Sequence, residues 1–263
     1  MPKRWTKQEE KKYYTELYFL YVEKNKTINE ISGIFKIAPQ TVFQRLQRLG
    51  IVTSPERKRG YLHMREDIRI PNRYTKELAE FFGIMLGDGS LSHFQVMVTL
   101  GTKEDAYAEY VCTLIEKIFK VKPKIAIRKK GYKDVYLGSV KLSSWLLGKG
   151  LVYNKVQSQV GVPKWIFQND DFMRAFVRGF FDTDGSVYRL KYGVQISLTN
   201  KSLPLLFSLQ DMLHRLQYKP SHVSSGKVYI TSRSEIFRFF KEVKPKNNKH
   251  VVRFCEFAKN IKN

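Results

Sequence analysis

The chain has 263 residues, of which 43% are hydrophobic, so it is long and apolar enough to bury a core and is not expected to be disordered. Its 47 lysines and arginines outnumber its 24 acids and give a formal net charge of +23, which favours a polyanionic partner. The basic residues are spread along the whole chain, which argues against a single membrane-binding tail or helix.

The cysteines and the apolar runs indicate where the protein works. Cys112 and Cys255 lack the spacing of metal ligands, and we interpret them as free thiols in a reducing compartment. No apolar run reaches the roughly 18 residues of a membrane span, and Met1 is not followed by a leader-like segment. We therefore expect a soluble intracellular protein of the cytoplasm, the nucleoid or an organelle matrix, with no membrane partner.

Residues 1–53 are predicted to form a small helical domain that resembles a helix-turn-helix and binds DNA. The segment Thr27–Glu30 has the spacing of a capping box, and Pro39 separates it from a second helical stripe that ends near Gly50. The second helix would present polar and basic side chains of the kind that contact bases and phosphates, namely Gln40, Gln44, Arg45 and Arg48. A helical bundle that contacts no DNA is the alternative. Residues 54–72, which include the polar segment SPERKRG, are predicted to form a linker.

The remainder of the chain is predicted to contain two copies of one design. The segment LAEFFGIMLGDGS at residues 78–90 recurs as FVRGFFDTDGS at residues 176–186, with the glycines and the final aspartate 96 positions apart. Each copy is followed by alternating segments and an amphipathic helix. We assign residues 73–155 to the first half and residues 156–263 to the second, and we expect a monomer with internal pseudo-twofold symmetry.

The alternating segments have a period of two, which predicts sheets with one apolar, helix-covered face and one polar, basic face. Such a face can enter the major groove of double-stranded DNA, where each base pair shows a distinct pattern of donors and acceptors. The candidate DNA-binding residues of the first half are His93, Gln95, Lys124, Arg128, Lys130 and Lys133. Those of the second half are Arg189, Lys191, Gln195, Lys227, Tyr229 and Arg233. An ordinary solvated sheet face is the alternative.

The aspartates that end the repeated motif, Asp88 and Asp184, are the candidate catalytic residues. Gly83 and Gly87 share one helix face, and Gly179 and Thr183 have the same spacing in the second copy. Small residues allow two helices to approach closely, which would bring the two aspartates together at the carboxyl ends. Adjacent carboxylates repel unless they bind a proton or a cation, and oxygen ligands suit Mg²⁺, which can activate water at a phosphate. Two ordinary Asp-Gly turns are the alternative.

The segments FFGIMLGDG at residues 81–89 and VRGFFDTDG at residues 177–185 resemble the paired motif of the LAGLIDADG homing endonucleases, over about residues 73–260. The resemblance implies an α+β fold of two pseudo-symmetric αββαββα halves, whose saddle-shaped sheets lie on the DNA major groove. It implies that Asp88 and Asp184 hold Mg²⁺, for which Mn²⁺ can substitute. The first motif departs from the family pattern, since Leu86 stands where the second motif keeps the acid Asp182.

The resemblance also suggests further site residues. Gly87 and Thr183, which precede the two aspartates, are the additional candidate metal ligands. Lys141, expected on a late strand beside Lys133, is the candidate basic catalytic residue. Thr102 and Asn200 stand where the family places polar residues that organise water.

The sequence thus favours a metal-dependent, site-specific endonuclease that hydrolyses phosphodiester bonds of duplex DNA, as in intron homing. A non-cleaving DNA-binding transcription regulator and an intron RNA maturase on the same scaffold are the alternatives. The presence of both aspartates favours the nuclease over the regulator, because paired carboxylates facing phosphate would weaken simple binding. Met1 and the residues before Asn263 differ from the ends of a whole intein, so we expect a free-standing or intron-encoded enzyme.

Overall fold

The computed structural model describes residues 6–24, 26–51, 53, 67–191 and 193–259. It divides into two units, Met1–Leu62 and His63–Asn263, each with its own hydrophobic core. Most of the predicted linker, residues 54–66, lies outside the described residues. No helix among the described residues is long and apolar enough to cross a membrane.

The first unit is helical, as its sequence predicts. Its helices are α1 (Lys7–Tyr18), which continues into the π-helical turn η1 (Phe19–Glu23), α2 (Ile28–Phe35) and α3 (Pro39–Arg48). The capping box at the start of α2 is formed, because Thr27 accepts the backbone N–H of Glu30 and Glu30 accepts that of Thr27. Lys36, in the left-handed region with φ 48°, ends α2. The buried core consists of Leu17, Tyr21, Ile31, Val42, Leu46 and Ile51.

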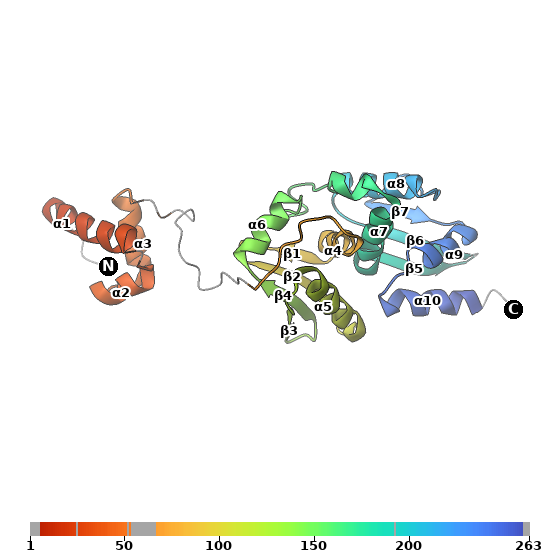
Figure 1. The fold of residues 1–263 in the computed structure, drawn as a ribbon, viewed down its shortest axis with the longest axis horizontal. Coiled ribbons are helices and arrows are strands. Elements are labelled where there is room, and N and C mark those ends of the chain that lie inside the picture. Colours follow the sequence, from red (N-terminus) through yellow and green to blue (C-terminus); the bar gives the residue numbers. More distant parts are fainter. Residues whose placement is uncertain (1–5, 25, 52, 54–66, 192, 260–263) are drawn as a thin grey trace. The chain divides into compact units, whose positions relative to one another are not determined.

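The second unit contains two sheets and the helices that cover them (Figure 1). The first half runs through α4 (Lys76–Leu86), β1 (Gly89–Leu91), β2 (Gln95–Leu100), α5 (Asp105–Phe119), β3 (Lys124–Ile127), β4 (Lys133–Gly138) and α6 (Val140–Gly148). The short helix η2 (Lys164–Gln168) precedes the second half. That half runs through α7 (Asp170–Asp184), β5 (Gly185–Leu190), β6 (Gly193–Thr199), α8 (Leu203–Arg215), β7 (Lys227–Ile230), α9 (Arg233–Glu242) and α10 (Asn248–Lys259). The predicted α+β fold with two related halves is confirmed.

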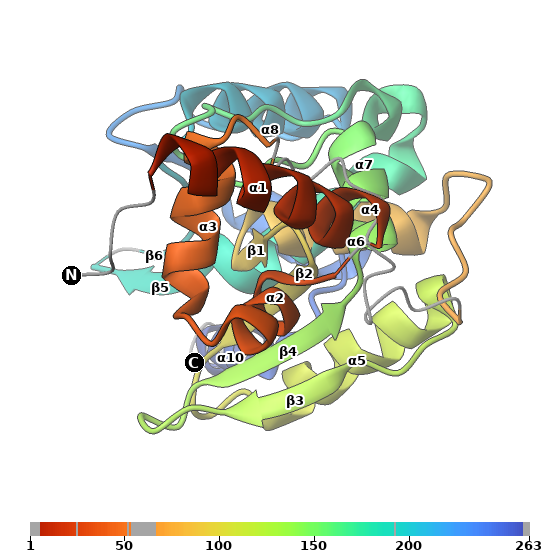
Figure 2. The ribbon, with the colours of Figure 1, turned by 90° about the vertical axis from the view of Figure 1, so that its left-hand side faces the viewer.

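The two sheets are antiparallel but differ in size. The first has four strands in the order β1-β2-β4-β3, with β3 and β4 side by side (Figure 2), and the second has three in the order β5-β6-β7. Among the described residues, the second half therefore lacks one strand of the αββαββα pattern. In its place the chain before β7 makes a hydrogen bond from Ser221 N–H to Tyr229 O and an isolated bridge between Ser224 and Lys227. Pro220 has no N–H to donate to a ladder, which shortens the pairing.

The sheets bury one face each, as the alternation predicts. In β2 the side chains of Val96, Val98 and Leu100 are buried, whereas Met97 and Thr99 between them are partly exposed. The same core continues through Val187 and Ile196 of the second sheet into the helices α4 and α7. These two helices lie side by side between the sheets (Figure 1) and join the two halves.

Candidate functional site

The seam between α4 and α7 is packed at backbone distance because glycines face each other across it. A Cβ atom on Gly83 would lie 2.2 Å from the carbonyl oxygen of Phe176, and one on Gly179 would lie 2.1 Å from that of Glu80. A Cβ on Gly87 would meet the hydroxyl of Thr183 at 2.0 Å. The two repeated motifs therefore pack against each other, and their carboxyl ends emerge at the same place.

Asp88 and Asp184 come together at this end of the seam. The pKa of Asp184 is raised to about 6, first by burial and then by the negative charge of Asp88, while a hydrogen bond of 2.9 Å from the Asn200 amide to Asp184 Oδ2 opposes the shift. The pKa of Asp88 is also raised, mainly by burial, and Glu104 adds to the shift. Two partly buried carboxylates that repel one another are stabilised by a positive charge placed between them or beside them.

Two lysines that the sequence analysis missed supply part of that charge. The ammonium of Lys155 donates to the carbonyl oxygens of Met85, at 3.1 Å, and of Gly87. Burial lowers the pKa of Lys155, and the charges of Asp184 and Asp88 oppose this shift. The ammonium group therefore interacts favourably with both carboxylates. The second lysine is Lys249, whose charge lowers the pKa of Asp88 and of Asp184.

These lysines occupy related places in the two halves. Lys155 follows Asp88 by 67 residues, and Lys249 follows Asp184 by 65. Lys155 lies in the irregular segment between α6 and η2, whereas Lys249 lies at the start of α10. This near-equal spacing is visible in the sequence. Comparing distances from each aspartate in the two halves would have identified both lysines, whereas strand parity does not.

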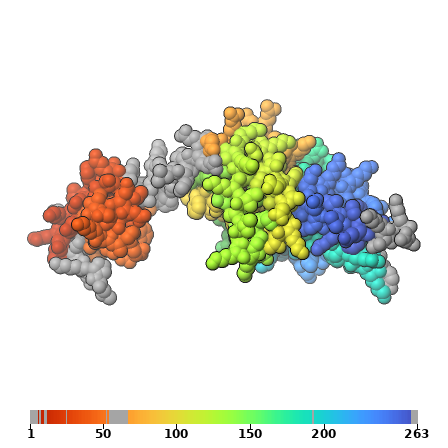
Figure 3. Space-filling view, turned by 90° about the horizontal axis from the view of Figure 1, so that it is seen from below, coloured from red at the N-terminus to blue at the C-terminus, as the bar shows by residue number. Residues whose placement is uncertain are grey.

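The segment before α10 is tied to both halves near the aspartates. Asp182 is buried, and it accepts the backbone N–H groups of Lys246 and Asn247 at 2.9 and 3.1 Å. Burial raises the pKa of Asp182 to about 7, although these two N–H groups oppose the shift. The amide of Asn247 also reaches Glu104 in the first half at 2.5 Å. Figure 3 shows the C-terminal segment in blue against the yellow surface of the first half.

Glu104 connects this segment to the lysines. Burial alone would raise the pKa of Glu104, but hydrogen bonds from Asn247, Lys249 and the backbone of Gly101 outweigh it and lower the pKa. The Glu104–Lys249 ion pair is 2.9 Å long. The site therefore has a third carboxylate nearby that is already neutralised by a lysine, in contrast to Asp88 and Asp184.

The two aspartates fit a hard divalent cation. Their oxygens are the ligand type that Mg²⁺ and Mn²⁺ accept, and a cation between them would offset both the burial and the charge repulsion that raise the pKa of Asp184. No group of three His, Cys, Asp or Glu side chains suited to a metal occurs among the described residues, so the pair would leave other coordination positions to water and phosphate. The predicted ligand Gly87 has its carbonyl engaged by Lys155, and the Thr183 hydroxyl is turned back to Gly179 O at 3.1 Å.

The predicted position of Lys141 is wrong. Lys141 lies on α6 and is exposed, because Ser139 caps that helix by accepting the N–H of Leu142 at 3.1 Å. It is therefore not on a strand beside Lys133. The charges that act on the aspartates come instead from Lys155, Lys249 and Glu104.

The polar face of the first sheet carries part of the predicted set. Gln95, Lys124 and Arg128 share this face with Met97 and Asp134, and Arg128 pairs with Asp134 at 2.5 Å. His93, before β2, lies 3.3 Å from the hydroxyl of Tyr153, and Lys130 is exposed in the turn before β4. Lys133 does not belong to this face. It pairs with Leu100 on the buried side, where its ammonium reaches Thr102 O at 2.7 Å and Asp105 at 3.1 Å.

The polar face of the second sheet carries Gln195, Lys227 and Tyr229, with the hydroxyl of Tyr188 donating to Gln195. The predicted placement of Arg189 and Lys191 on this face is wrong, because a hairpin interrupts the strand between Leu190 and Gly193 and reverses the parity. Arg189 is paired with Val194 on the helix-covered side. Arg189, Lys191 and Arg233 instead line a cavity on that side.

The predicted contact residues of the first unit lie on α3. Gln40, Gln44 and Arg48 are exposed, and Arg45 is partly buried. Gln40, Gln44 and Arg48 lie on the opposite side of α3 from the buried Val42 and Leu46, and Arg45 lies at the edge of the buried side. Their role in DNA binding stays a prediction.

Two family models match the two halves of the second unit. The WhiA LAGLIDADG-like domain matches residues 79–146, and the LAGLIDADG-like domain matches residues 171–244. The chain is a LAGLIDADG-fold protein. The two matched LAGLIDADG segments begin within or just at the start of α4 and α7, so they coincide with the two copies of the repeated motif.

The curated relatives share only a segment with this LAGLIDADG protein. It is 30% identical over 175 residues to the replication factor C small subunit of Methanocaldococcus jannaschii, and 22% identical over 193 residues to the glutamine–fructose-6-phosphate aminotransferase of the same organism. These matches cover 64% and 70% of this chain but only 9% and 17% of the relatives. The two names describe unrelated proteins, so neither of their activities is assigned to this chain.

Solved structures with a similar arrangement include a homing endonuclease and a WhiA domain. The homing endonuclease I-DmoI in complex with DNA and Ca gives a TM-score of 0.47 at 19% identity, over 64% of this chain and 88% of that one. The N-terminal LAGLIDADG domain of DUF199/WhiA gives a TM-score of 0.47 at 16% identity, over 65% and 82% of the two chains.

Proposed function

We propose that this LAGLIDADG-fold protein is a metal-dependent endonuclease that hydrolyses phosphodiester bonds in duplex DNA. The observation that carries the proposal is the pair Asp88 and Asp184 at the end of the glycine-packed seam, where burial and mutual repulsion raise the pKa of Asp184 to about 6. A protein that only bound DNA would gain nothing from such a pair, since each ionised carboxylate repels the phosphate backbone. The net charge of +23 supports a polyanionic substrate.

The residues of the site have distinct roles in this proposal. Asp88 and Asp184 would hold Mg²⁺, or Mn²⁺ in its place, and the ion would supply an activated water and neutralise charge on the phosphate. Asn200 holds Asp184 in position through its amide. Lys155 places a positive charge beside both carboxylates, where it can stabilise the negative charge that develops on phosphate.

The sheets are proposed to bind the DNA through their polar faces. Gln95, Lys124 and Arg128 of the first sheet and Gln195, Lys227 and Tyr229 of the second carry donors and acceptors for base edges and phosphates. One chain contributes both aspartates, so we propose that it acts as a monomer.

The test is a cleavage selection on a genomic or randomised DNA library with Mg²⁺, followed by assays on the selected site. We expect Asp88→Asn and Asp184→Asn each to lower the cleavage rate by about 10³-fold or more, because each removes a metal ligand. The matched control is Asp211→Asn, which alters an exposed aspartate paired with Arg215 and should leave cleavage unchanged. Cleavage that persists in either of the first two variants contradicts the proposal.

A non-cleaving DNA-binding protein is the second candidate, and Lys155 is the observation that favours it. Its ammonium group already interacts electrostatically with both aspartates and could balance their negative charge without a metal. In that case the wild-type protein would bind duplex DNA at low salt yet cleave nothing in the selection with either Mg²⁺ or Mn²⁺. Metal-dependent cleavage by the wild-type protein rules this candidate out.

A further inference from the structure

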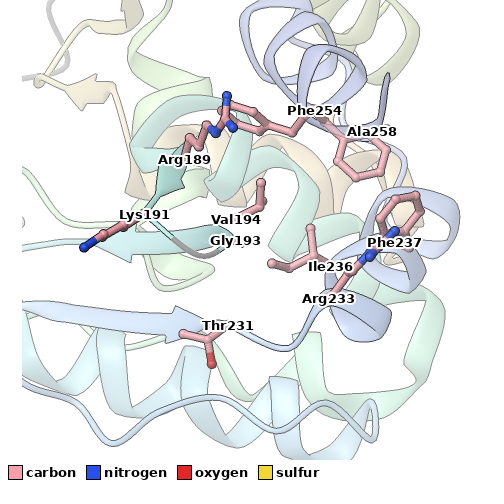
Figure 4. A pocket seen from close by; sticks show the side chains of 11 residues that line it. Arg189, Lys191, Gly193, Val194, Thr231, Arg233, Ile236, Phe237, Phe254 and Ala258 are labelled. Atoms are coloured by element: carbon pink, nitrogen blue, oxygen red, sulfur yellow. The ribbon is translucent and has the colours of Figure 1, made fainter. Parts of the chain in front are cut away.

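A cavity of about 320 Å³ lies between the β5–β6 hairpin and the helices α9 and α10 (Figure 4). It is on the helix-covered side of the second sheet and shares no residue with the aspartate pair. Its size falls at the lower end of the range for small-ligand sites. Polar and aromatic residues both line it, with the basic residues at the rim and the aromatic rings forming the apolar wall.

Basic residues stand at the rim. Arg189 reaches this side of the sheet because it pairs with Val194, in a position where the alternation calls for an apolar residue. Lys191 follows in the hairpin, and Arg233 opens α9, close to the hydroxyl-bearing Thr231. All four are exposed. Figure 4 shows the guanidinium of Arg189 beside Phe254 and that of Arg233 beside Phe237.

Aromatic rings form the apolar part. Phe237 meets Phe254 edge to face with ring centroids 5.0 Å apart, and Phe254 is stacked on Phe240 at 3.9 Å with an interplanar angle of 5°. The rings are thus held in fixed orientations by their neighbours. The buried Ile236 and the side chains of Val194, Phe257 and Ala258 also line the cavity. A flat apolar group fits such a wall better than a branched aliphatic one.

The two arginines of the cavity have no acidic partner within the described part of the chain. No acidic side chain lines the cavity, and neither Arg189 nor Arg233 is among the residues that form ion pairs in the described part of the chain. The guanidinium of Arg233 lies over the ring of Phe237, 6.0 Å from its centroid. Guanidinium groups bind phosphate in a bidentate manner, and their flat faces pair with aromatic rings.

We propose that this cavity binds a nucleoside monophosphate unit, with the base against the phenylalanines and the phosphate on the arginines. The unit can be a free mononucleotide or an unpaired nucleotide of a nucleic-acid strand, since both present the same base and phosphate. The site is separate from the proposed nuclease centre, and neither depends on the other.

The experiment is calorimetric titration of the full-length protein with AMP, with adenosine and with inorganic phosphate. AMP should bind at least about tenfold more tightly than either fragment, because only AMP uses both parts of the cavity. Arg233→Gln and Phe237→Leu should each weaken AMP binding by about tenfold or more. The matched control is Lys241→Gln, which removes an exposed charge from the same helix α9 and should leave AMP binding unchanged.

Two further measurements show whether the bound unit is a free nucleotide or part of a strand, and distinguish failure of this proposal from failure of the proposed nuclease activity. A short single-stranded oligonucleotide that competes with AMP places the unit in a strand, and absence of competition indicates the free nucleotide. Asp184→Asn should bind AMP as the wild type does, whatever its effect on cleavage. The proposal is overturned if AMP fails to bind at millimolar concentration, if Arg233→Gln and Phe237→Leu bind AMP normally, or if an acidic aromatic peptide binds the cavity more tightly than AMP does.

Discussion

At the scale of single residues, the raised pKa of Asp184 makes a prediction about stability. Its pKa is about 6 in the folded protein against an ordinary value of 3.8, so folding favours the protonated carboxyl. The stability that this preference contributes is complete below pH 3.8 and is lost as the pH rises through about 6. At pH 8 in a metal-free buffer, we therefore expect Asp184→Asn to raise the free energy of unfolding by about 1–3 kcal/mol.

Denaturant unfolding in the presence of EDTA measures this gain. Asp211→Asn is the control, because Asp211 is half exposed and its replacement should change stability little. Added Mg²⁺ should reduce the difference in the free energy of unfolding between Asp184→Asn and the wild type, because a ligand that binds the folded wild type stabilises it. An Asp184→Asn protein that is equally or less stable than the wild type at pH 8 would show that burial and the charge of Asp88 do not destabilise the ionised carboxylate.

Lys155 leads to a prediction about the pH dependence of cleavage. Its positive charge lowers the pKa of both Asp184 and Asp88, so its removal in Lys155→Met should raise the pKa of both. A metal binds the ionised carboxylates, so cleavage should rise with pH through the pKa of Asp184, and this rise should move to higher pH in the variant. The rate in Mg²⁺ measured between pH 5 and pH 9 tests the shift.

Lys141→Met is the matched control for this experiment. Lys141 is exposed on α6, so its replacement should leave the position of the pH profile unchanged. A shift in the Lys141→Met profile with none in the Lys155→Met profile would restore the role that the sequence suggested for Lys141. Identical pH profiles for the wild type, Lys155→Met and Lys141→Met would show that Lys155 does not affect the pKa of the aspartates.

The residue-scale predictions from the sequence succeeded where the repeat carried the information. Asp88 and Asp184 could be brought together because the glycines of both motifs fix which helix faces meet. Lys155 could not be found in this way, because it reaches the site from an irregular segment with no period. The alternation puts Arg189 on the wrong face because a hairpin at Lys191 interrupts the strand, and Gly193, with φ 155°, marks the break.

At the scale of elements, the α4–α7 seam leads to a prediction about packing. In Gly83→Ala the added methyl would lie 2.2 Å from the Phe176 carbonyl oxygen, a backbone atom that cannot change rotamer. The helices must then separate, and we expect a loss of about 3 kcal/mol in the free energy of unfolding. The control is Gly148→Ala at the end of α6, where nothing lies within 4 Å of the new Cβ. Equal stability of the two variants would contradict close packing at the seam.

The same pair of helices contains a buried polar contact that the sequence did not reveal. Glu80 of α4 is buried and accepts hydrogen bonds from Arg178 of α7 and, at 2.5 Å, from the hydroxyl of Tyr110. In the sequence, Glu80 is a single charge within an apolar stripe and looks like a solvated position. Its partner lies 98 residues away, so only the fold shows that the charge is matched.

At the scale of the whole molecule, the repeat predicted more symmetry than the protein has. Both halves share the motif helix, the strand pair and the following helix, because these carry the glycine and alternation patterns. The fourth strand of the second half is reduced to a few hydrogen bonds around Ser221, next to Pro220. Asp184 is held by Asn200, whereas Asp88 lies near Glu104 and its lysine. The two aspartates therefore have unequal surroundings within one site.

The division into two units gives the last prediction. The first unit has its own core and exposes Gln40, Gln44 and Arg48 on α3, and we propose that it adds a second DNA-binding surface to the chain. Covalent linkage to a second DNA-binding unit raises the local concentration of each. Deletion of residues 1–62 should therefore weaken duplex binding by about 10²-fold while leaving the cleavage rate at saturating enzyme unchanged.

Binding measured at two salt concentrations and cleavage measured with enzyme in excess separate the two effects. The truncated protein should also show a shallower dependence of affinity on salt, because fewer lysines and arginines displace counterions. Circular dichroism and an unfolding transition establish that the remaining unit is folded. A folded truncated protein that no longer cleaves at saturating concentration would mean that the first unit completes the active site, and unchanged affinity would mean that it does not bind DNA.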